Sequence, residues 1–264
     1  MKFLLTAINA KYIHSNPGVY SLKMFAESQG AAQAVQGDQN PWEDGLPCVP
    51  LGAEKQEEHG PYAGVTEKTA RESHSMQVEI AEYTINNQME LILEDIYRRK
   101  PDMVGISCYI WNIAYALDLV RDIHKVLPDT DIWLGGPEVS WHAKKLLERH
   151  PFLRGIMRGE GEETFLELLE YYRGKRQTLE EIRGLTFRQA MLDRSLPSME
   201  LQHQTDEMQM VRQPAMVEIS WKSQESVVTE THDRGLLPLD AVPFIYEDLQ
   251  QFENRILYYE TSRG

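Results

Sequence analysis

Cysteine is scarce in this chain of 264 residues, which has only Cys48 and Cys108. The two lie far apart in sequence, and neither belongs to a Cys-x-x-Cys or other metal-ligand spacing, so we predict no disulfide framework and no metal ligands. A reducing cytoplasm is the default location for such a chain. Long hydrophobic runs are absent too, which leaves no predicted signal peptide and no membrane-spanning helix.

Blocks of basic residues are also missing, since 27 lysines and arginines face 41 acidic residues, for a net charge of −14. A nucleic-acid surface needs a basic patch, so none is predicted. The chain has no Gly-x-Gly-x-x-Gly after its first apolar run and no P-loop, which disfavours ordinary dinucleotide or nucleotide binding. No Ser-His-Asp arrangement is readable, and no catalytic residue is predicted.

What the sequence does contain is a regular alternation of strand and helix patterns. Apolar runs predict five strands, at Phe3–Ile8, Val78–Tyr83, Met103–Ile106, Ile132–Leu134 and Gly155–Met157. Apolar residues at helical spacing predict helices at Val19–Ala26, Asn86–Arg99, Ile113–Ile123, Val139–Leu147 and Glu160–Tyr172. The alternation predicts an α/β fold: a flavodoxin-like (Rossmann-like), doubly wound parallel sheet in the order 2-1-3-4-5. Its crevice would lie between the first and third strands.

We divide the chain into an α/β domain at 1–175, with an insertion at 29–75, and an irregular extension at 176–264. The extension contains possible strands at Leu185–Arg188 and Met216–Ser220 and a proline-punctuated linker at Leu236–Pro243. A short helix at Tyr246–Phe252 and a strand at Ile256–Thr261 complete the expected elements. The polar stretches at 29–75 and 189–235 receive no predicted role.

Gly135 and Gly136 follow a predicted buried strand, at the sheet edge where open α/β folds bind ligands. Glycine lets the backbone approach a bulky ligand closely. We therefore expect this pair to matter for ligand binding more than for folding, with any side chain there projecting into the crevice.

Three other segments reach the same edge, and each has two open interpretations. The polar loop Asn9–Gly18 either contacts a ligand or satisfies turn and cap hydrogen bonds. Ser107 with Tyr109 and Trp111 either lines a flat apolar pocket or supplies core aromatics. Arg158–Glu162 either presents backbone amides to a ligand or forms a glycine turn whose acids suit a helix N-terminus.

These residues together resemble the N-terminal cobalamin-binding domain of B12-binding radical S-adenosylmethionine proteins. The resemblance covers residues 1–172 and rests on the segments Asn9–Gly18, Ser107–Tyr109, Gly135–Glu138 and Gly159–Phe165. The tail adds to it, because in that family a segment similar to Leu237–Pro243 links two domains. A strand similar to Tyr258–Gly264 then leads into a Cys-x-x-x-Cys-x-x-Cys cluster motif. The resemblance implies that this chain stops just before a radical domain.

The resemblance further implies a corrinoid partner and a C-terminal radical SAM domain of the same protein, with [4Fe–4S] and S-adenosylmethionine held only in that domain. The fragment would not be catalytic alone, whereas its parent would be a B12-dependent, methyltransferase-like enzyme. The implied cofactor-binding residues are Asn9, Tyr12, His14, Ser15, Ser107, Tyr109, Trp111, Gly135, Gly136, Pro137, Glu138, Gly159, Glu160 and Gly161.

The loop after the first strand departs from the Asp-x-His-x-x-Gly pattern of methionine-synthase-type domains. Tyr12 stands where the aspartate would be, and Gly18 comes one residue late. We therefore expect cobalamin to be bound base-off, without His14 on cobalt. A rival hypothesis from another class is a flavodoxin-like scaffold or interaction domain without a cofactor, which reconstitution with hydroxocobalamin would distinguish.

Overall fold

The computed structural model describes residues 1–30, 76–189, 227–246 and 248–262. Nearly all of the predicted insertion at 29–75, most of the stretch at 189–235 and the possible strand at Met216–Ser220 lie outside these residues. The boundary that we placed at residue 175 remains a prediction.

A single sheet organises the chain, and its central strands are the five predicted ones. They are β1 (Lys2–Asn9), β2 (Gln77–Thr84), β3 (Met103–Ser107), β4 (Asp131–Gly135) and β5 (Gly155–Met157). All pair in parallel, in the order β2-β1-β3-β4-β5. The predicted fold class and strand order are therefore confirmed.

Two further strands correct the predicted number from five to seven. β6 (Leu185–Arg188) pairs antiparallel with β5, and β7 (Val228–Glu230) pairs antiparallel with β6. Leu185 and Phe187 are buried, so β6 contributes to the core as well as to the hydrogen-bond ladder. Without these two strands the edge of β5 would expose unpaired backbone groups, which proteins usually cover.

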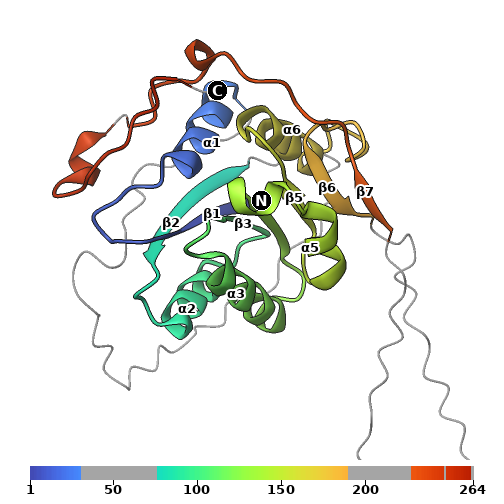
Figure 1. Cartoon of the computed structure of the whole chain (residues 1–264), viewed down its shortest axis with the longest axis horizontal. Coiled ribbons are helices and arrows are strands. Elements are labelled where there is room, and N and C mark those ends of the chain that lie inside the picture. Colours follow the sequence, from blue (N-terminus) through green and yellow to red (C-terminus); the bar gives the residue numbers. More distant parts are fainter. Residues whose placement is uncertain (31–75, 190–226, 247, 263–264) are drawn as a thin grey trace, which may run out of the picture.

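Helices cover both faces of the sheet, as predicted for a doubly wound fold (Figure 1). α1 (Pro17–Ser28) and α6 (Glu162–Tyr172) lie on one face, and α2 (Met89–Arg99) and α3 (Ile113–Val126) lie on the other. β1 is buried on both sides, because its alternate residues enter two separate cores. Phe3 and Leu5 pack on the α1/α6 side, whereas Leu4 and Ile8 pack on the α2/α3 side.

The helix predicted at Val139–Leu147 is in fact two helices, α4 (Pro137–Ser140) and α5 (Ala143–Arg149). His142 has φ −128° and ψ 31°, outside the helical region, and interrupts the hydrogen-bond ladder. Apolar spacing alone suggested one helix, because Val139 and Leu147 are both buried in the same core.

Beyond β7 the chain runs across the side of the molecule that carries α6 and α1 (Figure 1). It contains two 3₁₀ turns, at Leu239–Ala241 and Leu249–Phe252. The strand predicted at Ile256–Thr261 is wrong: the segment is irregular and makes only an isolated bridge between Ile256 and His14. Of its apolar residues, Leu257 packs in a small cluster with Tyr20 and Met24 of α1, whereas Ile256, Tyr258 and Tyr259 are exposed.

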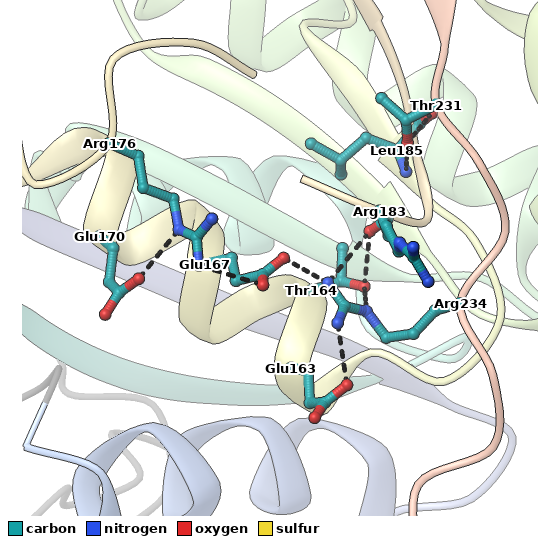
Figure 2. A network of polar contacts seen from close by, with 9 residues as sticks. All are labelled: Glu163, Thr164, Glu167, Glu170, Arg176, Arg183, Leu185, Thr231 and Arg234. Atoms are coloured by element: carbon teal, nitrogen blue, oxygen red, sulfur yellow. Dashed lines mark hydrogen bonds and ion pairs between the residues drawn. The ribbon is translucent and has the colours of Figure 1, made fainter. Parts of the chain in front are cut away.

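A network of ion pairs fastens the start of this segment to α6 (Figure 2). Arg234 donates to Glu163 (2.8 Å), to the Thr164 hydroxyl (3.1 Å) and to Glu167. Arg176 reaches the same Glu167 carboxylate at 3.1 Å. A guanidinium with several carboxylate and hydroxyl acceptors is a strong and directional tether.

None of the helices in the described ranges is long and apolar enough to cross a membrane.

Candidate functional site

A pocket of about 260 Å³ opens at the carboxyl ends of β1, β3, β4 and β5. Parallel strands whose connections run to opposite faces leave a crevice at this edge, where such folds bind ligands. Here β1 and β3 are neighbours whose helices lie on opposite faces. The pocket therefore occupies the crevice predicted between the first and third strands.

The sheet forms the floor of this pocket, and small residues leave the space. Gly105 pairs with Leu5 on one side and with Trp133 on the other, and Ser107 pairs with Gly135. These positions alternate along their strands on the face toward α1 and α6. A run of residues with little or no side chain thus keeps a slot open between the sheet and the two helices.

α1 and the start of α6 form the opposite wall. Gly18, Val19 and Leu22 reach the pocket from α1, and Gly161 and Glu162 from the α6 end. A Cβ at Gly161 would lie 2.8 Å from Leu22 Cδ2, so this glycine permits the close approach of the two helices. The wall is mainly apolar, which suits a flat ligand that inserts between helix and sheet.

The two adjacent glycines differ in what they do. A Cβ at Gly135 would lie 3.7 Å from Met157 Cε, at ordinary contact distance. A Cβ at Gly136 would lie 2.5 Å from the carbonyl oxygen of Cys108, and Gly136 has φ +105°. The expectation that both matter more for binding than for folding is therefore wrong for Gly136, which the backbone itself requires to be glycine.

Polar groups lie where the floor meets the mouth. Asn16 Nδ2 donates to Ser107 Oγ at 3.1 Å, which leaves the serine hydroxyl hydrogen free to donate elsewhere. Tyr109 stacks on Trp111, with ring centroids 4.5 Å apart and planes 8° from parallel. Burial raises the pKa of Tyr109, and Asn16 offsets this in part, so the phenol stays neutral and can donate a hydrogen bond.

Three carboxylates border the other side of the pocket: Glu160, Glu162 and Glu260. Glu162 is 4% exposed and accepts from Ser21 Oγ at 2.6 Å. Glu160 accepts from the Leu237 backbone N–H at 2.5 Å. The acids provide acceptors for N–H donors and make this end unfavourable for a phosphate group.

Comparisons with known proteins agree with this geometry. Residues 64–169 match the protein-family model described as the B12 binding domain. The cobalamin-dependent radical SAM methyltransferase TokK of Streptomyces tokunonensis is 33% identical over 70 residues, which are 26% of this chain and 10% of TokK. This region is homologous to the B12-binding domains of cobalamin-dependent radical SAM methyltransferases.

Other relatives extend the comparison. The hopanoid C-3 methylase of Methylococcus capsulatus is 29% identical over 124 residues, 46% of this chain and 23% of that protein. A structure of the cobalamin-dependent S-adenosylmethionine radical enzyme OxsB, with aqua-cobalamin and S-adenosylmethionine bound, has a TM-score of 0.57 and 15% identity. It covers 99% of this chain and 27% of the OxsB chain, and it supports the fold. The matches thus span a tenth to about a quarter of the lengths of these relatives.

Half of the predicted site residues line the pocket. The predicted residues in its lining are Ser107, Tyr109, Gly135, Gly136, Gly159, Glu160 and Gly161. Trp111 is not part of the lining, but it stacks on Tyr109, which does line the pocket. Pro137 and Glu138 form the first turn of α4 next to the glycine pair, outside the lining.

The predicted residues of the loop after β1 lie outside the pocket lining. Asn9 and Ser15 are buried, and their side chains bond to Glu82 and Tyr246. His14 Nδ1 lies 2.8 Å from the Tyr258 hydroxyl. Tyr12 is 76% exposed. Their part in cofactor binding remains a prediction.

Gly18 and Glu162, at the ends of two segments that the sequence offered as ligand contacts, also line the pocket. Sequence reasoning missed the other lining residues: Leu5, Val19, Leu22, Gly105, Ile106, Met157 and Glu260. Gly105 carried a readable signal, since a glycine inside a strand often marks a close approach by a ligand or backbone. No sequence signal pointed to Glu260, because it belongs to an irregular segment near the C-terminus that reaches the pocket only in the folded structure.

Proposed function

We propose that this B12-binding domain binds cobalamin in the pocket between the sheet and the α1/α6 layer. The observation that carries the proposal is the slot over Ser107 and Gly135, beside Gly105, where the strand register places residues with little or no side chain. A flat, aromatic dimethylbenzimidazole tail fits a narrow slot with an apolar wall. Inserted there, it would lie against Ser107 and Gly135.

The groups around the mouth suit the corrin periphery. Corrin amides carry N–H donors, and Glu160 and Glu260 supply carboxylate acceptors at the rim. Tyr109, which also lines the pocket, stacks on Trp111 and adds an aromatic surface to the mouth. We propose that these residues hold the corrin, together with the loops at Asn9–Gly18 and Gly159–Glu162.

We further propose that the cofactor is base-off and has no histidine on cobalt. A metal-bound imidazole is usually oriented by a carboxylate, a carbonyl or a water on its other nitrogen. Here His14 Nδ1 pairs with the Tyr258 hydroxyl, and Tyr12 stands where an orienting aspartate would be. An EPR spectrum of the cob(II)alamin form tests this. Nitrogen superhyperfine splitting that vanishes in His14→Ala would contradict it.

Cobalamin supplies a cobalt centre that can carry a methyl group. Two of the relatives named above are a cobalamin-dependent radical SAM methyltransferase and a methylase, so we propose that this domain serves methyl transfer together with a radical SAM domain. That domain would hold the [4Fe–4S] cluster and S-adenosylmethionine. The B12-binding domain would bind and orient the corrinoid and shield its tail from water, and would not be catalytic alone.

Reconstitution tests the binding step directly. The purified 264-residue chain is mixed with hydroxocobalamin, desalted and examined by visible absorbance, with flavin mononucleotide as a control for unspecific retention of flat ligands. We expect about one corrinoid per chain and no retained flavin. A colourless protein after desalting, or equal retention of both ligands, would overturn the proposal.

A further inference from the structure

The C-terminal segment forms part of the pocket. We call residues 236–246 and 248–262 the strap. Glu260 of the strap borders the main pocket together with Gly18 and Tyr109. A second, smaller cavity of about 50 Å³ lies between the strap and the start of α1. The strap thus covers the α1 side of the mouth.

Backbone hydrogen bonds dock the strap onto the loop after β1. The Ile256 N–H donates to the Ile13 carbonyl at 2.6 Å, and the Ser15 N–H donates to the Ile256 carbonyl at 3.4 Å. The side chain of Ser15 lies 2.9 Å from the Tyr246 hydroxyl. The Tyr246 hydroxyl in turn donates to the Tyr258 carbonyl at 2.9 Å. Strap and loop therefore move as one unit while these bonds persist.

Glu82, at the end of β2, joins the loop, α1 and the strap through one carboxylate. Its Oε1 accepts from Asn9 Nδ2 (3.0 Å) and from the Asn16 backbone N–H (2.8 Å). Its Oε2 accepts from the Tyr20 hydroxyl (3.0 Å) and from Arg255 of the strap (2.7 Å). The Glu82 side chain is 6% exposed and that of Arg255 15%, so this ion pair is shielded from solvent.

An apolar cluster supports the ion pair. Tyr246 and Phe252 of the strap pack against Tyr20 of α1, with Tyr20 and Phe252 rings 5.2 Å apart and nearly perpendicular. Tyr20 therefore has its ring in the strap cluster and its hydroxyl on Glu82. Packing and charge thus hold the strap at the same place, beside the helix that walls the pocket.

We propose that Arg255 is a positioning residue for the cofactor pocket: its pairing with Glu82 holds the strap, and with it Glu260, against the mouth. Docking of the strap and retention of the corrinoid are then coupled, and each stabilises the other. This inference rests on the proposed function for the identity of the ligand. The contacts that hold the strap are independent of it.

Coupling of this kind is reciprocal. If strap docking tightens corrinoid binding, corrinoid binding must strengthen strap docking by the same factor. A purely structural Arg255 would loosen the strap when replaced and leave both the affinity and the effect of the ligand unchanged. These two effects together separate a positioning role from a structural one.

The test compares three variants of the full chain. Arg255→Met keeps an apolar stem and removes the charge; Arg255→Lys restores a charge. Arg121→Met is a matched control, because Arg121 pairs with Asp118 on the exposed side of α3, far from the strap. Circular dichroism confirms folding, visible titration gives the dissociation constant for hydroxocobalamin, and hydrogen exchange reports the amides of Ser15 and Ile256.

We expect Arg255→Met to weaken hydroxocobalamin binding by about fivefold or more, the usual lower range of such coupling. Exchange at Ile256 should become faster in this variant. In the parent chain, hydroxocobalamin should slow that exchange. Arg255→Lys should recover part of both effects, and Arg121→Met should show neither.

The outcomes distinguish a failure of the proposed function from a failure of the strap inference. If the parent chain binds no hydroxocobalamin, the proposed function fails and the coupling fails with it. If the parent binds but Arg255→Met binds equally well, or if the ligand leaves exchange at Ile256 unchanged, the strap inference alone is overturned. If Arg255→Met does not fold, the inference is tested by two other measurements. These are the affinity of Arg255→Lys for hydroxocobalamin and the effect of hydroxocobalamin on exchange at Ile256 in the parent chain.

Discussion

The floor and the strap enclose the same pocket by different means. The floor is made of backbone and small residues, such as Gly105 and Gly135, on paired strands. The strap is held by a few backbone hydrogen bonds, by an apolar cluster and by the ion pair of Arg255 with Glu82. The shape of the floor is set by paired backbone, whereas the docking of the strap depends on side-chain contacts that single substitutions can weaken. In our proposal, the floor determines which group fits and the strap determines how firmly it is held.

The largest effect should come from the most constrained point of the floor. In Gly136→Ala the new Cβ meets the Cys108 carbonyl at 2.5 Å on a backbone with φ +105°. Backbone strain and overpacking together should lower the free energy of unfolding by about 3 kcal/mol. Urea denaturation measures this, with Gly135→Ala as the matched neighbour, which should stay within about 1 kcal/mol of the parent. Equal stability of the two variants would remove the distinction between these glycines.

The next effect concerns Arg234, which fastens the segment just before the strap to α6. Arg234→Met removes the bonds to Glu163, Thr164 and Glu167 (Figure 2). We expect a loss of about 2 kcal/mol in the free energy of unfolding, typical of charged hydrogen bonds that are partly buried. Hydroxocobalamin affinity should change less than twofold, unlike in Arg255→Met. A larger loss of affinity would show that the attachment of the segment before the strap also controls binding, and not only the ion pair between Arg255 and Glu82.

Gly135→Val tests the floor as a binding surface. Its Cβ has room beside Met157, and the strand accommodates a β-branched residue, so stability should stay within about 1 kcal/mol of the parent. The added methyl groups would occupy the slot and weaken hydroxocobalamin binding by about tenfold or more, which equals about 1.4 kcal/mol. Visible titration measures it. Unchanged affinity would mean that the cofactor tail does not pass this strand end.

The smallest effect concerns the thiol beneath the floor. Burial, and secondarily Glu138, raises the pKa of Cys108 far above its ordinary value. The folded state then keeps a proton that the unfolded chain loses above about pH 8.5. Stability should therefore fall by about 1 kcal/mol between pH 7.5 and 9.5. In a Cys48→Ser background, urea denaturation at both pH values should show this fall, and Cys108→Ala should flatten it.

The same contrast explains how much could be predicted from sequence. The bounds of β5, the strand order and the pocket position follow from apolar periodicity and strand-end glycines, which are local signals. Glu82 and Arg255 are 173 positions apart, and no local pattern links them. The segment 256–261 has the alternation of a strand, but its partner is a loop, so its pattern was misleading. Gly136 was misjudged because sequence does not reveal φ.

The pairing of β6 with β7 has a consequence for the architecture of the chain. Arg188 is the partner of Val228, and the Gln189 N–H donates to the Val227 carbonyl at 3.1 Å. The polypeptide therefore leaves the sheet and returns to it at adjacent positions, on the side remote from the pocket. Since the entropy of closing a loop grows only slowly with its length, the cost of joining two positions that are paired in the sheet depends little on how many residues separate them. A change in the length of the chain between these two positions would act at the end of the sheet opposite to the strand ends that line the pocket.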